Sequence, residues 1–173
     1  MKVLLIIAPE NYQDIEYGKT RQELEKVGIQ VEVASIKLGE AKGKLGGRVP
    51  VDLLLEQVEI KKYDAIVFIG GPGAVFYQNN NLAHKIIQEA MLANKILAAI
   101  CIAPTILAYA GALKGKKATV WSSDEVKEPI NILKNNNADY IAENVVIDGK
   151  IITASGPQAA EEFGKKIAES LIH

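Results

Sequence analysis

The sequence contains one cysteine and two histidines among 173 residues. A single cysteine cannot form an internal disulfide bond, so a disulfide-stabilised secreted scaffold is excluded. The histidines, His84 and His173, stand far from Cys101 in the chain and supply no cluster of metal ligands. We therefore expect no metal site, and the same scarcity argues against a catalytic Cys–His pair within one chain.

The sequence also lacks an excess of charge of one sign and a long apolar run. Its 20 basic and 21 acidic residues give a net charge of −1, which argues against nucleic-acid binding through bulk charge. No stretch approaches the roughly 20 apolar residues that a membrane span needs. The apolar first residues are interrupted by Glu10, before a signal peptide would end. We expect a cytoplasmic protein with neither a nucleic-acid nor a membrane partner.

The residues that are present favour one domain over residues 1–173, because the length suits a single domain and 49% of the residues are apolar. Continuous apolar runs predict strands that are buried on both faces. Amphipathic segments between them predict helices. The predicted strands are residues 3–8, 29–34, 65–69, 96–100 and 118–121, and the predicted helices are residues 14–27, 82–93, 104–110, 125–134 and 158–171.

Two further segments predict hairpins. Residues 39–52 are rich in glycine and predict a surface hairpin or loop. Residues 145–154 contain two apolar runs around an Asp-Gly turn, which is typical of a β-hairpin. Alternating strands and helices together predict an α/β sandwich with a largely parallel sheet.

Cys101 lies where a ligand site is expected, because ligands of open α/β sheets bind beyond the carboxyl ends of the strands. The loop with Glu10, Asp14 and Glu16 and the loop that starts at Gly70 should reach the same edge. Gly70–Gly73 lacks the Lys-Ser/Thr of a phosphate-binding loop, and no Gly-x-Gly-x-x-Gly follows the first strand, so we expect no nucleotide or other cofactor.

Cys101 directly follows a predicted strand and precedes a predicted helix, as in a nucleophile elbow. Such a turn needs small residues two positions to either side, and Ala99 and Ala103 meet that need. A helix N-terminus would lower the thiol pKa, and backbone N–H groups of the turn could bind a developing oxyanion. The alternative is a buried cysteine that only fills space.

With this elbow and the Gly-Gly strand end before it, the chain resembles the ThiJ/PfpI superfamily, which includes Pfp-type intracellular proteases and the parkinsonism-associated protein deglycase. The most specific sign is an Ile-Cys-x-x-Pro elbow combined with a Gly-Gly strand end. The matching segments are Ala8 to Glu16 with Gly28, Asp64 to Gly71, Ala99 to Cys101 with Pro104 and Gly111, and Asp148-Gly149 through Ser155-Gly156-Pro157.

The resemblance implies a three-layer, flavodoxin-like sandwich of the class I glutamine-amidotransferase type, and a homodimer. It places Glu16 where family members carry a glutamate that hydrogen-bonds the cysteine sulfur, so Glu16 and Cys101 are the predicted catalytic pair. Gly71 and Ile102 match the residues whose N–H groups form the oxyanion pocket. For Glu16 the alternative is an exposed first-turn helix acid, and for Gly71 a plain turn glycine.

The chain departs from the family pattern at three positions. Protease-like members carry a histidine where this chain has Ile102, and a glutamate where alignment places Val75. Deglycase-like members carry a histidine where this chain has Trp121. Glu16 is thus left as the partner of the thiol and as its general acid and base. Arg48 could hold an anion, although a solvated loop residue is the simpler interpretation.

Three functions remain open at this point. The first is a glyoxalase or deglycase in which Cys101 attacks small reactive carbonyl compounds. The second is a non-enzymatic redox sensor or stress-protective protein in which an oxidant converts Cys101 to a sulfinate. The third is a cysteine peptidase or amidase, which the loss of both protease-type partners makes the weakest of the three.

Overall fold

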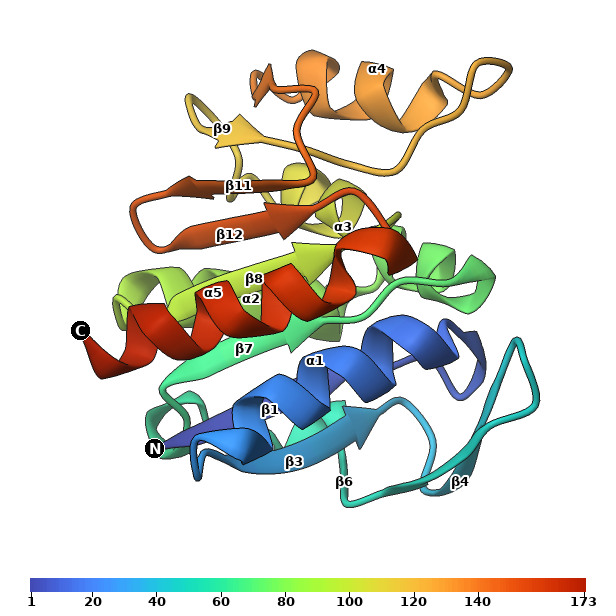
Figure 1. Cartoon of the computed structure of the whole chain (residues 1–173), viewed down its shortest axis with the longest axis vertical. Coiled ribbons are helices and arrows are strands. Elements are labelled where there is room, and N and C mark those ends of the chain that lie inside the picture. The colour runs from blue at the N-terminus through green and yellow to red at the C-terminus, as the bar shows by residue number, and fades with distance from the viewer.

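The computed structural model describes residues 1–173 (Figure 1). Seven strands form its central sheet. Their order across the sheet is β11-β12-β8-β7-β1-β3-β6. Every neighbouring pair is parallel except the β11–β12 hairpin, which confirms the prediction of a largely parallel sheet. The strands are β1 (Lys2–Ile6), β3 (Gln30–Ser35), β6 (Leu53–Leu54), β7 (Ala65–Phe68), β8 (Ile96–Ile100), β11 (Val145–Asp148) and β12 (Ile151–Ala154).

The apolar runs are continuous because helices cover both faces of this sheet. Along β1, Val3 and Leu5 belong to one core cluster, while Leu4 and Ile6 belong to the other. Helices α1 (Asp14–Lys26) and α5 (Ala160–Ile172) pack against each other over the first face. Helices α2 (Asn81–Leu92) and α3 (Pro104–Tyr109) cover the opposite face. The result is the predicted three-layer α/β sandwich.

The helix boundaries follow from capping chemistry. The Asn80 side chain accepts a hydrogen bond from the Ala83 N–H at 2.9 Å, which confirms that the asparagine run caps α2. The Gln13 side chain caps α1 by accepting from the Ile15 N–H at 2.8 Å. None of the helices has both the length and the apolar character that crossing a bilayer needs.

Two predicted elements are shorter than expected. The strand predicted over residues 118–121 is reduced to β9 (Lys117–Ala118), which pairs with β10 (Asp139–Tyr140). The rest of that segment leaves β10 because the Trp121 N–H donates to the Cys101 carbonyl at 2.8 Å. Helix α4 (Glu128–Asn135) begins three residues later than predicted, with Pro129 in its first turn, where the missing N–H is tolerated.

The glycine-rich segment folds as the predicted hairpin. Strands β4 (Gly39–Gly43) and β5 (Arg48–Val51) are antiparallel, and β2 (Glu10–Tyr12) joins β4 in a small second sheet. Short 3₁₀ turns complete the chain at η1 (Leu55–Gln57), η2 (Ile60–Lys62), η3 (Pro72–Asn79) and η4 (Pro157–Ala159). The hairpin thus lies beside the loop that follows β1, at the carboxyl edge of the central sheet (Figure 1).

Candidate functional site

Cys101 occupies a sharp turn between β8 and α3. Its φ angle is 64°, in the left-handed region that side chains other than glycine rarely adopt. Backbone bonds hold it there, because its N–H donates to the Ala154 carbonyl at 2.9 Å and its carbonyl accepts from Trp121. Ala99 and Ala103 are completely buried on either side of the turn. This geometry is that of a nucleophile elbow, as the sequence predicts.

Glu16 lies directly beneath this turn rather than on the protein surface. It comes from the first turn of α1, yet the residue has no exposed area. Its Oε2 accepts a hydrogen bond from the Gly70 N–H at 2.9 Å. Its Oε1 is buried without any N–H or O–H partner, and the group that faces the carboxyl is the Cys101 thiol. The alternative of a solvated helix acid is therefore wrong.

Two glycines allow this close approach. A Cβ on Gly70 would lie 2.6 Å from the Cβ of Cys101 and 2.7 Å from Oε2 of Glu16. Gly71 has a φ angle of 105°, and a Cβ there would lie 2.5 Å from the carbonyl oxygen of Asn11. The Gly-Gly strand end is thus required by the contact between the β7 loop, the β1 loop and the elbow.

Burial dominates the ionisation of the pair. It raises the pKa of the Glu16 carboxyl from 4.5 to about 7, although hydrogen bonds from Cys101 and Gly70 act to lower it. Burial and the facing Glu16 carboxyl also raise the pKa of the Cys101 thiol, while the N–H groups of Gly71 and Ile102 act in the opposite direction. A charge on the Glu16 carboxyl therefore opposes ionisation of the thiol.

The prediction of a lowered thiol pKa is therefore wrong for the resting site. Helix α3 has only six residues, and its N-terminus does not outweigh the desolvation of the sulfur or the adjacent carboxyl. A proton must leave the pair before the sulfur can carry a negative charge beside a neutral Glu16. The Glu16 carboxyl, with its pKa near neutrality, is the group that can take up and return that proton.

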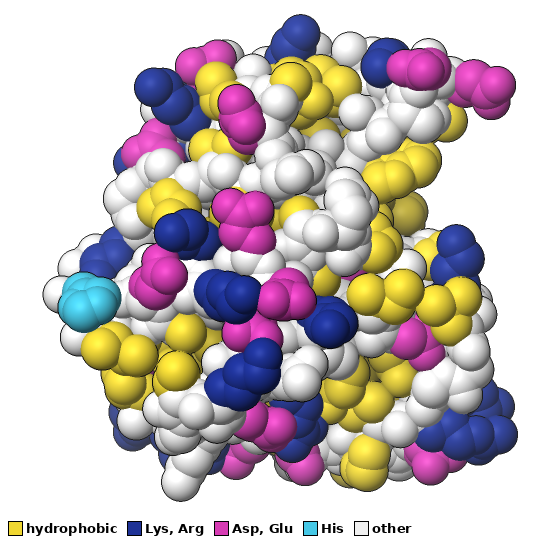
Figure 2. All heavy atoms as spheres, viewed as in Figure 1, with side chains coloured by type: hydrophobic (Ala, Val, Ile, Leu, Met, Phe, Trp, Pro, Cys, Tyr) yellow, Lys and Arg dark blue, Asp and Glu magenta, His cyan; other side chains and the backbone are white.

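A cavity of about 340 Å³ opens above the thiol. On this side of the molecule Figure 2 shows a notch in the outline, below the segment that leads to α4, with apolar side chains on both of its sides. Most of the lining is uncharged, and Lys44 is its one charged residue. The lining residues are Gln13, Lys44, Gly71, Pro72, Val75, Cys101, Ile102, Trp121 and Pro157.

The predicted residues separate into two groups. Gly71, Cys101 and Ile102 line the cavity, and the buried Glu16 faces the Cys101 thiol from beneath it. Glu10 does not, because it is exposed and lies 3.9 Å from Lys42.

Other charged candidates serve the hairpin instead. The Asp14 carboxylate accepts from two hairpin N–H groups. Arg48 is exposed and pairs with Glu40 at 2.7 Å, as a solvated loop residue would. Of the two histidines, His84 lies half-buried on α2, where its Nε2 hydrogen-bonds the Gln78 carbonyl at 2.7 Å.

Sequence reasoning missed Gln13 and Lys44. The only signal for Lys44 in the sequence is its place in the glycine-rich hairpin. In that hairpin Arg48, not Lys44, was the residue considered for anion binding. Nothing in the sequence reveals which side of that hairpin faces the thiol, because β2 and β4 meet through a long-range pairing.

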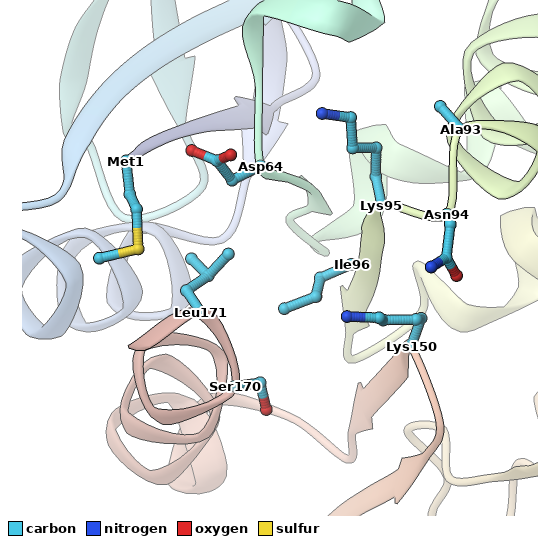
Figure 3. Close-up of a pocket in the computed structure, with 9 residues that line it drawn as sticks. All are labelled: Met1, Asp64, Ala93, Asn94, Lys95, Ile96, Lys150, Ser170 and Leu171. Atoms are coloured by element: carbon cyan, nitrogen blue, oxygen red, sulfur yellow. The ribbon is translucent and has the colours of Figure 1, made fainter. Parts of the chain in front are cut away.

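A second hollow, of about 300 Å³, lies at the opposite edge of the sheet, near both ends of the chain (Figure 3). It is lined by Met1, Asp64, Ala93, Asn94, Lys95, Ile96, Lys150, Ser170 and Leu171. The Asp64 carboxylate is already occupied there by the Lys2 N–H at 2.8 Å. This hollow holds no thiol, histidine or unpartnered buried polar group, so the cavity at Cys101 is the candidate site. No group of three or more His, Cys, Asp or Glu side chains is arranged to hold a metal ion.

Comparison with known proteins identifies the family of this chain. The family model of the DJ-1/PfpI family matches residues 1–170. The chain belongs to the DJ-1/PfpI family. It is 34% identical to a deglycase from Thermococcus kodakarensis, over 91% of each chain. It is 29% identical to a glutathione-independent glyoxalase from Caenorhabditis elegans, over 97% of this chain and 87% of that protein.

Among solved DJ-1/PfpI structures, a ThiJ/PfpI domain protein from Brachyspira murdochii superposes with a TM-score of 0.93 at 32% identity. That match covers 99% of this chain and 96% of the other. The resemblance seen in the sequence and the predicted fold class are thus confirmed. The three positions that depart from the family pattern, Val75, Ile102 and Trp121, all line the cavity, so the departures lie at the site itself.

Proposed function

We propose that this chain is an enzyme of the glyoxalase or deglycase type that acts on small α-oxoaldehydes through Cys101 and Glu16. The observation that carries the proposal is the buried Glu16 carboxyl, which faces the thiol with one oxygen unpartnered and a pKa of about 7. A group with this pKa can both accept and donate a proton near neutral pH. The names of the deglycase and glyoxalase relatives support the same reaction class.

The first step is addition of the Cys101 sulfur to the aldehyde carbon. A C–S bond forms, and the thiol proton passes through Glu16 to the former aldehyde oxygen, which gives a hemithioacetal. The N–H groups of Gly71 and Ile102, which point at the sulfur in the resting site, are placed to stabilise the negative oxygen as it develops.

Proton transfer by Glu16 then completes an internal oxidation and reduction. Glu16 removes the proton from the carbon bound to sulfur, and a proton returns to the neighbouring carbonyl carbon. The first carbon is oxidised to a thioester while the second is reduced to an alcohol. Water cleaves the thioester, releases a 2-hydroxy acid and restores the thiol. Atoms balance with the addition of one water, and no external oxidant or cofactor enters.

The test is conversion of methylglyoxal to lactate. Cys101→Ala should produce no lactate, and Glu16→Gln should lower the rate by at least about 10²-fold, the usual contribution of a general acid–base. Glu23→Gln is the matched control, because Glu23 is a buried acid of the same helix that pairs with Lys26 and does not face the Cys101 thiol. Lactate must be measured, since a bare thiol also consumes methylglyoxal once without turnover. Equal lactate production by the wild type and Cys101→Ala would refute the proposal.

Redox sensing is the second candidate function. It is favoured by the three donors around the sulfur, namely a protonated Glu16 and the two N–H groups of Gly71 and Ile102, which would suit the oxygens of a sulfinate. After mild peroxide treatment, mass spectrometry should then find two added oxygens on Cys101. Oxidation of exposed Met91 with Cys101 unmodified would contradict this candidate.

A peptidase is the least supported of the proposals, because Ile102 and Val75 stand where the resemblance places the protease-type partners. Turnover of a peptide amide that disappears in Cys101→Ser would revive it. A homodimer, a single domain over residues 1–173 and a cytoplasmic location also stay predictions. Light scattering on the purified chain tests the first of these.

A further inference from the structure

Lys44 is the one charged side chain that lines the Cys101 cavity. It lies on the exposed turn between β4 and β5 and takes part in none of the ion pairs of the structure. The neighbouring cations are paired, since Lys42 lies 3.9 Å from Glu10 and Arg48 lies 2.7 Å from Glu40. Lys44 therefore brings to the lining of the cavity a positive charge that no ion pair occupies.

The backbone around Lys44 is held in place. Its N–H donates to the Tyr12 carbonyl at 2.8 Å, which ties the turn to the loop before α1. The Asp14 carboxylate accepts from the N–H groups of Leu45 and Gly47, each at 2.7 Å. A Cβ on Gly47 would lie 2.3 Å from Oδ1 of Asp14, so a residue with a side chain would not fit at this position. The flexible side chain thus starts from an anchored position beside the cavity.

The positive charge of Lys44 acts on the reacting pair: it lowers the pKa of the buried Glu16 carboxyl, against the larger effect of burial. The remaining lining of the cavity is largely apolar and includes Pro72, Val75, Ile102 and Trp121. Such a cavity suits a short carbon chain with a reactive carbonyl at one end and a negative group at the other.

We propose that Lys44 binds an anionic group of the substrate, so that the site prefers α-oxoaldehydes that carry a carboxylate over neutral ones. This specificity rests on the proposed function. A suitable probe is 4,5-dioxopentanoate, with its neutral methyl ester for comparison. Addition of one water to the acid gives 2-hydroxyglutarate, by the same oxidation of the aldehyde carbon and reduction of the ketone carbon.

The kinetic experiment compares the acid with its ester in four proteins: the wild type, Lys44→Gln, Lys44→Arg and the control Lys42→Gln. Lys42 belongs to the same hairpin but does not line the cavity. An exposed ion pair is worth up to about 1 kcal/mol, so the wild type should prefer the acid about fivefold in kcat/KM. Lys44→Gln should lose this preference through KM, while Lys44→Arg and Lys42→Gln should keep it. An acid-to-ester ratio that is the same in Lys44→Gln and the wild type would overturn the proposal.

A binding experiment separates this proposal from the proposed function. Trp121 is the only tryptophan and lines the cavity, so its fluorescence reports occupancy. Titration with 2-hydroxyglutarate should give a Kd about fivefold higher in Lys44→Gln than in the wild type, with Lys42→Gln unchanged. If no protein turns over methylglyoxal but this difference persists, the Lys44 site stands and the proposed reaction falls. Equal Kd values in all three proteins would refute the anion site.

Discussion

Replacing the buried Glu16 by glutamine should change how the stability of this protein depends on pH. Burial raises the pKa of the carboxyl from 4.5 to about 7, so the folded chain holds a proton there that the unfolded chain has already released. Between these two values the free energy of unfolding must therefore fall as pH rises. At about 1.4 kcal/mol for each unit of pKa, the wild type should lose about 3 kcal/mol between pH 4.5 and pH 8.

Glu16→Gln cannot ionise and should remove this dependence. Its side-chain oxygen can still accept from the Gly70 N–H, so the fold should be retained. Below pH 5 the variant should be about as stable as the wild type. At pH 8 it should be more stable by roughly 2–3 kcal/mol, because the wild type then holds a buried charge. Ionisation of the Cys101 thiol does not contribute between pH 5 and pH 8, since the pKa of Cys101 is raised above its ordinary value of 9.0.

Urea denaturation at pH 5, 6, 7 and 8 measures the effect. The slope m is compared between the proteins, because a change in m would indicate a change in the unfolded state. The control is Glu23→Gln, which removes another buried acid of α1 that does not face the Cys101 thiol. Carboxylates with lowered pKa values, such as Glu32 and Asp148, affect the pH dependence of stability only at lower pH. They do not contribute between pH 5 and pH 8. A wild type whose stability is constant or rises from pH 5 to pH 8, or a Glu16→Gln variant with the same slope, would refute the reasoning.

Other substitutions test the packing and capping that hold the site. Gly70→Ala should destabilise the chain by about 1–3 kcal/mol, because its Cβ would overlap the pair, whereas Gly18→Ala in open space on α1 should stabilise it by about 0.5–1 kcal/mol. Thermal unfolding compares the two, and equal effects would contradict the close approach. Asn80→Ala should cost about 1 kcal/mol through loss of the α2 cap, and the same loss in Asn79→Ala would show that the cap is not specific. Asp14→Ala should speed hydrogen exchange at the Leu45 and Gly47 amides, which an unchanged exchange rate would disprove.

Six of the seven strands of the central sheet could be predicted from local pattern, and only the two-residue β6 was missed. Its strands are continuous apolar runs because both faces are covered, and that composition differs from the amphipathic helices between them. Segments without such a pattern were predicted less well. Residues 119–121 have strand-like composition, but a backbone bond to Cys101 directs them to the cavity instead.

The candidate site could be predicted in part for a related reason. The order of residues around Cys101 is local, and a strand, a small-residue turn and a helix start are enough to indicate an elbow. The lone cysteine and the scarcity of histidine also argue, without any structure, against a Cys–His mechanism. The family resemblance added Glu16, Gly71 and Ile102 as candidates.

Only the tertiary structure decided the environment of those residues. The local sequence of Glu16 also fits a solvated helix acid, the alternative to its predicted role, yet the crossing of α1 beneath the elbow removes it from water and raises its pKa. The same burial raises the pKa of the Cys101 thiol, against the expectation from its position before a helix. Lys44 reaches the cavity through the pairing of β2 with β4. Burial and charge at a site depend on residues distant in the chain, so local sequence determines the elbow while the fold determines its chemistry.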